Sequence, residues 1–127
     1  MDLRRKIDSF LIEWKKNPDR LPLIIRGARQ VGKTYSIKKF ASNYKSFVEI
    51  NFITSPEYRR VFSSGYSPDT IIREITLINP DFIFVPGETL ILFDEIQACP
   101  DCTTSLKFFK LDGRYDVICS GSLLDSQ

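Results

Sequence analysis

The sequence predicts an α/β fold in which a parallel sheet is covered by helices on both faces. Its 127 residues are the length of one domain, and 43% of them are apolar, which is enough for a packed core. Short apolar segments typical of strands alternate with segments of helical periodicity. Alternating strands and helices favour a parallel sheet in a three-layer α/β domain.

Four segments are predicted to be helical. An amphipathic helix is expected over 2–17, where apolar residues recur at helical spacing and Asn17-Pro18 ends the pattern. A second helix should follow Thr34, with an apolar face that continues to Tyr44. A third starts at Ser67-Pro68, a cap followed by a proline in the first turn, and ends at 79–80. A fourth is expected over 103–111.

Four apolar runs are predicted to be strands. They cover 21–25, 47–52, 89–93 and 117–119, and the segment 53–85 is otherwise less clear. In a parallel sheet, ligands bind beyond the carboxyl ends of the strands. Gly27, Asp94 and Ser120 each follow a predicted strand, so this topology brings them to one edge of the sheet.

Composition excludes several kinds of site. The net charge of +2, from 18 basic and 16 acidic residues, gives no argument for nucleic acid or an anionic membrane as a partner. No histidine is present, which excludes Ser/His/Asp triads and histidine-containing metal sites. The sequence shows neither an apolar run of about 18 residues nor a signal peptide, so a cytoplasmic location is expected.

The three cysteines do not predict a disulfide framework. Cys99 and Cys102 have the spacing of a redox or zinc motif, but a structural zinc ion needs four ligands. Only Cys119 could add a third ligand. The pair is therefore interpreted as incidental, in a loop.

The most specific motif fits the phosphate-loop pattern G-x-x-x-x-G-K-[ST] between a strand and a helix. It consists of Gly27, Ala28, Arg29, Gln30, Val31, Gly32, Lys33 and Thr34. Glycines let successive backbone N–H groups face one concavity, and the helix N-terminus adds positive potential. Lys33 supplies a charge for the outer phosphates of ATP, and the Thr34 hydroxyl can bind Mg²⁺.

A second motif is the apolar strand 90–93 followed by Asp94 and Glu95. Asp94 is the candidate for holding Mg²⁺, which makes it a metal-site residue together with Thr34. Glu95 can orient and polarise a water molecule for attack on the γ-phosphate. The pair of carboxylates favours hydrolysis over transfer to a small substrate.

The chain resembles the prokaryotic AAA-type ATPases, in the group whose ATPase domain is usually followed by a C-terminal domain of unknown function. The segments that carry the resemblance are 26–34, 93–97 and 120–123. It implies a P-loop NTPase core and a single AAA-type ATP-binding domain over 1–127, with the nucleotide core at 20–127 and its C-terminal end missing. It also implies that Ser120, with Ser122 as the alternative, lies near the attacking water; a strand-ending turn is the competing interpretation.

Three function classes remain open from the sequence. The leading one is an ATPase domain that binds MgATP and hydrolyses it in the full-length protein to drive an attached module. The alternatives are a nucleotide-dependent switch or binding module with negligible turnover, and a P-loop kinase. Expected partners are ATP, the C-terminal remainder of the protein and further copies of the chain. No arginine finger is identified: Arg114 is assigned to the surface, and Arg29 lies within the phosphate loop.

Overall fold

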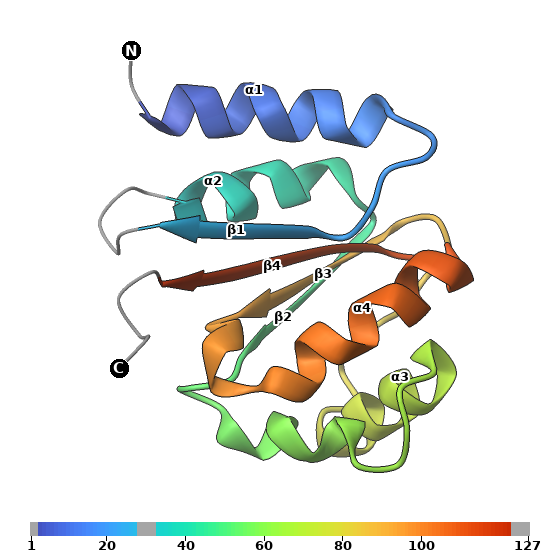
Figure 1. Ribbon diagram of the computed structural model, residues 1–127. Coiled ribbons are helices and arrows are strands. Elements are labelled where there is room, and N and C mark those ends of the chain that lie inside the picture. Colours follow the sequence, from blue (N-terminus) through green and yellow to red (C-terminus); the bar gives the residue numbers. More distant parts are fainter. Residues whose placement is uncertain (1–2, 28–32, 123–127) are drawn as a thin grey trace.

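The computed structural model describes residues 3–27 and 33–122, which form a layered α/β domain (Figure 1). In chain order the elements are α1 (Leu3–Lys16), β1 (Leu23–Gly27), α2 (Lys33–Phe40), η2 (Ala41–Asn43), β2 (Ser46–Asn51), η3 (Pro56–Phe62), α3 (Pro68–Ile78), β3 (Thr89–Asp94), η4 (Ile96–Ala98), α4 (Pro100–Asp112) and β4 (Asp116–Ser122). The η elements are short 3₁₀ helices.

The four strands form one parallel sheet with the order β1-β4-β3-β2. Helices α1 and α2 cover one face, and α3 and α4 cover the other (Figure 1). The predicted fold class, a parallel sheet between two helical layers, is therefore confirmed. Because β4 pairs with both β1 and β3, the last strand in the sequence lies inside the sheet, between the two strands that precede the predicted phosphate-binding and acidic residues.

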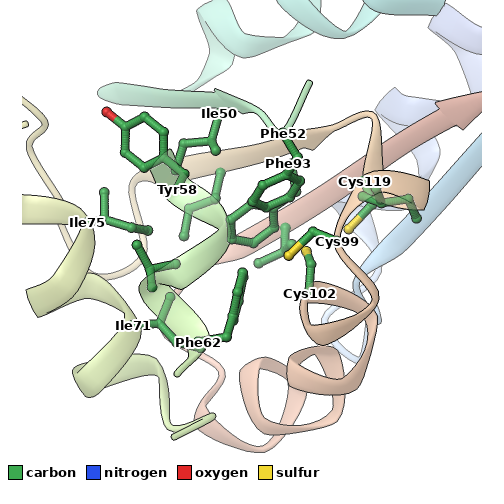
Figure 2. Close-up of a cluster of buried hydrophobic side chains, with 14 of the residues drawn as sticks. Ile50, Phe52, Tyr58, Phe62, Ile71, Ile75, Phe93, Cys99, Cys102 and Cys119 are labelled. Carbon is green, nitrogen blue, oxygen red and sulfur yellow. The ribbon is translucent and has the colours of Figure 1, made fainter. Parts of the chain in front are cut away.

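Each face of the sheet has its own apolar core, since neighbouring residues of a strand point to opposite faces. In β3, Leu90 and Leu92 pack with α1 and α2, whereas Ile91 and Phe93 pack toward η3, α3 and α4. Figure 2 shows the second core, in which the rings of Phe52 and Phe93 stack with centroids 5.7 Å apart. Strand β3 is fully buried, which explains its continuous apolar sequence.

The third helix begins as predicted. The Ser67 side chain accepts a hydrogen bond from the Thr70 backbone N–H at 3.2 Å, and Pro68 occupies the first turn. The unclear segment before it contains η3, whose Tyr58, Val61 and Phe62 enter the core. Its 3₁₀ geometry lacks the periodicity by which a longer α-helix can be predicted.

Several predicted boundaries were wrong, among them those of β1, which covers Leu23–Gly27 rather than 21–25. Helix α4 begins at Pro100, not at 103, so Cys102 lies in its first turn rather than in a loop. Helix α2 ends at Phe40, and η2 carries the chain on toward Tyr44. Strand β4 continues to Ser122 because Gly121 and Ser122 pair with Arg26 and Gly27 of β1, whereas the residues Ser-Gly-Ser had suggested that it ends earlier.

Within the described ranges, no helix combines the length and the apolar character that crossing a lipid bilayer requires.

Candidate functional site

Polar residues gather at the carboxyl ends of the strands, at the left of the sheet in Figure 1. Gly27 is the last residue of β1, and it stands opposite Ser122 of β4. Asp94 is the last residue of β3, and it stands opposite Ser120 of β4 on one side and Asn51 of β2 on the other. The strand register therefore places residues from four strands at one edge.

Lys33 is the first residue of α2 and is buried, with 7% of its surface exposed. Its Nζ donates hydrogen bonds to the Gly121 carbonyl at 2.6 Å and to the Gly27 carbonyl at 3.2 Å. Within residues 3–27 and 33–122, no carboxylate forms an ion pair with it. A buried ammonium group that is compensated only by carbonyl dipoles retains a strong attraction for an anion.

The middle of the predicted phosphate loop, formed by Ala28, Arg29, Gln30, Val31 and Gly32, lies outside the described residues. Its two ends are described: Gly27 ends β1, and Lys33 and Thr34 open α2. Thr34 is half-buried beside Lys33. The strand that should precede the motif and the helix that should follow it are therefore both present.

The Asp94 carboxylate is 9% exposed and is held by three donors. The Ser120 hydroxyl and the Glu95 backbone N–H, the latter at 2.9 Å, both donate to Oδ1. The Asn51 amide donates to Oδ2 at 3.4 Å. In the described part of the chain no basic side chain pairs with Asp94, so its oxygens suit a hard cation such as Mg²⁺.

Asn51 was not identified from the sequence. Its side-chain oxygen also accepts from the backbone N–H groups of Ile53, at 2.9 Å, and Thr54, at 3.0 Å, which turns the chain after β2. A polar residue at the end of an apolar strand is a signal that could have found it. That signal is weak, because asparagine is also common in turns that bind nothing.

Glu95 follows Asp94 in a left-handed backbone conformation, with φ 59° and ψ 50°. It is the only residue other than glycine in the described ranges with a positive φ. Its half-buried carboxylate accepts a hydrogen bond from the Gln97 amide at 2.7 Å. This conformation costs a residue with a side chain about 1–2 kcal/mol, and such strain is concentrated at functional sites.

Comparison with protein families decides the class of the chain. A family model described as "AAA domain" matches residues 19–126. The chain belongs to this AAA domain family. It is therefore an ATP-binding domain of the P-loop class, and the resemblance noted in the sequence is confirmed.

The structure of C. elegans PCH-2 is similar to this AAA domain, with a TM-score of 0.48 and 18% sequence identity. The match covers 98% of this chain and 35% of that chain, so this AAA domain spans about a third of the length of that protein. No curated protein matches the chain.

The cysteines of the AAA domain lie in the apolar core that Figure 2 shows. Cys99, Cys102 and Cys119 are all buried, and Cys119 is in β4. Burial raises the pKa values of the Cys99 and Cys102 thiols, and contact with Cys119 adds to the effect on Cys102. Raised pKa values keep these thiols neutral, and neutral thiols are poor metal ligands and nucleophiles.

Arg114 of the AAA domain lies just before β4, at the amino end of that strand. Its guanidinium pairs with Asp69 at 2.5 Å and with Asp112 at 2.8 Å. The side chain is 38% exposed, which is consistent with the predicted surface position. Its carboxylate partners tie it to α3 and α4, away from the polar edge.

Proposed function

We propose that this AAA domain binds MgATP and hydrolyses it. One observation carries the proposal: a buried, ion-unpaired Lys33 and a buried, ion-unpaired Asp94 lie at the same edge of the sheet, among the residues described. Lysine at a helix N-terminus suits the outer phosphates of a nucleotide. A carboxylate held by neutral donors suits a divalent cation.

The proposed binding residues follow from this arrangement. Gly27 to Thr34 wrap the phosphates, with Lys33 donating to the outer ones. Thr34 and Asp94 hold the metal ion, which neutralises the charge that develops on the transferred phosphoryl group. On binding, the Lys33 ammonium exchanges its bonds to the Gly121 and Gly27 carbonyls for bonds to phosphate oxygens. Both carbonyls belong to β-strands and are fixed. Before the nucleotide binds, they therefore keep Lys33 close to the position that it takes in the complex.

Glu95 is proposed as the residue that orients the attacking water and accepts its proton. It adjoins the proposed metal ligand Asp94 in sequence, and its half-buried carboxylate accepts a hydrogen bond from the Gln97 amide. Ser120 is proposed to act through Asp94, because its hydroxyl donates to that carboxylate. Ser122 stands beside Gly27 in the register and is the alternative polar residue of β4.

The proposal extends to the protein as a whole. Residues 1–127 act as one ATP-binding domain, whose nucleotide core covers 20–127 behind the N-terminal helix. Hydrolysis in the full-length protein drives a module attached at the C-terminal side, and copies of the chain assemble at their nucleotide sites. The protein is proposed to work in the cytoplasm.

The Glu95→Gln variant of the full-length protein tests this function. The amide keeps the shape of the side chain but cannot accept the proton, so the rate of phosphate release should fall roughly 10²–10⁴-fold. Binding of a fluorescent ATP analogue in the presence of Mg²⁺ should remain at the parent affinity. Turnover at the parent rate would exclude the proposed role of Glu95. Parent protein that binds MgATP but releases no phosphate would favour the nucleotide-dependent switch.

A further inference from the structure

Gln97 contacts the Glu95 carboxylate directly. Its Nε2 donates to Glu95 Oε1 at 2.7 Å, a short distance typical of hydrogen bonds to an ionised acceptor. Only the amide nitrogen of a glutamine can donate, so this contact fixes which way the amide of Gln97 faces. The two residues lie on either side of the buried Ile96, which anchors η4 in the core.

The backbone around Glu95 is held at both ends. Its N–H donates to Asp94 Oδ1 at 2.9 Å, and its carbonyl accepts from the Ala98 N–H at 3.0 Å. The left-handed conformation of Glu95 sets the direction in which its side chain leaves the strand. The bond to Gln97 acts on the end of that side chain.

The position of Gln97 depends on Gly121 of β4. A Cβ atom placed on Gly121 would lie 2.9 Å from Gln97 Oε1, which is closer than real Cβ contacts. Gln97 Oε1 is buried, and no donor from residues 3–27 or 33–122 reaches it. A buried amide oxygen without a donor is costly, by about 1–3 kcal/mol. This cost accompanies the hydrogen bond that Nε2 of the same amide donates to Glu95.

We propose that Gln97 is a positioning residue that holds the Glu95 carboxylate in the orientation needed for water attack, in the space that Gly121 leaves free. This inference rests on the proposed hydrolytic function. Gln97 acts through Glu95 and touches neither the nucleotide nor the metal ion. Its removal should therefore slow the chemical step and leave ground-state binding of ATP unchanged.

The Gln97→Met variant of the full-length protein removes the donor but keeps the length of the side chain. Loss of one hydrogen bond to a charged group should lower kcat about 10- to 100-fold. The affinity for MgATP should stay within about twofold of the parent value. In a Glu95→Gln background, adding Gln97→Met should lower the remaining rate by less than about twofold, because the two residues act as one unit.

Gly121→Ala provides a second route to the same result. The added methyl group displaces the Gln97 amide, so kcat should again fall about tenfold. In a Gln97→Ala background the methyl group no longer meets Gln97 Oε1, and its remaining close neighbours are Ile96 Cγ1 at 3.3 Å and Arg26 Nη1 at 3.4 Å. Gly121→Ala should then cost less in kcat than it costs in the parent protein. Thermal unfolding of each variant identifies any protein that has not folded.

The outcomes separate the two proposals. A parent-like or raised kcat in folded Gln97→Met, while Glu95→Gln is inactive, would overturn the role of Gln97 alone. An additive loss in the double variant would also overturn it, because a purely structural role adds to the loss of Glu95. Parent-like turnover by Glu95→Gln, or no turnover by the parent protein, would overturn the hydrolytic function and this inference with it.

Discussion

The two ends of the sheet both contain charged groups that are at least half-buried, but the surrounding residues compensate these charges differently. At the amino end of β4, Asp116 accepts from Arg20 Nε at 2.9 Å and from the Tyr44 hydroxyl at 2.5 Å, and Arg20 lies over the Trp14 ring. At the carboxyl ends, Lys33 contacts backbone carbonyls, and Asp94 contacts hydroxyl, amide and backbone donors.

The difference distinguishes a structural network from a binding site. The Arg20–Asp116 pair neutralises itself, so that end of the sheet gains little from a charged ligand. Lys33 and Asp94 each keep their charge for a ligand of opposite sign, and hydrogen bonds hold them in place meanwhile. A charge that the fold positions but does not neutralise is the physical signature of the proposed nucleotide site.

The largest expected effect comes from Lys33→Ala. Nucleotide affinity should fall by at least about 10- to 100-fold, because a buried charge-assisted contact worth about 1.5–3 kcal/mol is lost. The fold should survive, since Lys33 contacts carbonyls of the strand ends rather than the apolar core. Titration with a fluorescent ATP analogue measures the affinity, and unchanged affinity would contradict the phosphate-loop assignment.

Arg20→Ala at the opposite end is the matched control. It breaks the ion pair with Asp116, in which the Arg20 side chain is 25% exposed and the Asp116 side chain is 14% exposed. The free energy of unfolding should therefore fall by about 1–3 kcal/mol. Nucleotide affinity should not change. If the two variants behaved alike in both measurements, the distinction between the two ends of the sheet would be lost.

A smaller effect is expected from Tyr44→Phe at high pH. Burial raises the pKa of Tyr44 above its usual value, and the hydrogen bond to Asp116 adds to this. Above pH of about 10 the unfolded chain loses this proton while the folded protein keeps it, so unfolding becomes easier by up to about 1.4 kcal/mol per pH unit. The stabilisation is complete below pH of about 10.

Chemical denaturation of both proteins between about pH 9 and 11.5 measures the difference, since this range spans the ordinary pKa of tyrosine. Tyr44→Phe should lose less stability over this range than the parent protein does. Other tyrosines contribute equally to both proteins and cancel in the comparison. Parallel curves would show that the phenol of Tyr44 is not held protonated by the fold.

The smallest expected effect concerns zinc. Cys99 and Cys102 are buried among aromatic residues, and no group of three or more potential ligands occurs within the described ranges. A zinc ion with two thiolate ligands would be under-coordinated. We expect no zinc in protein purified without chelators, measured by elemental analysis. One zinc per chain would show that the buried Cys99 and Cys102 thiols do bind a metal ion.

Much of the fold follows from local sequence signals. The apolar run of β3 and the Ser67-Pro68 helix start both depend on neighbouring residues, and both were predicted correctly. The extent of β4 was not, because Ser120 to Ser122 resemble a turn when considered alone. Pairing with β1, and with β3 as far as Ser120, outweighs that local preference, and such pairing is a property of the whole sheet.

The sequence by itself determined which residue types could serve a nucleotide, because glycines, Lys33, Asp94 and Glu95 stand at the spacing that phosphate and metal binding require. Only the folded structure decided which side chains form hydrogen bonds to Asp94 and Glu95. Strand register brought Asn51 and Ser120 to Asp94, and the turn after β3 brought Gln97 to Glu95 opposite Gly121. Of these contacts, the one that spans most of the chain joins Asn51 to Asp94. The distance between such residues is set by packing of the whole domain rather than by local preference.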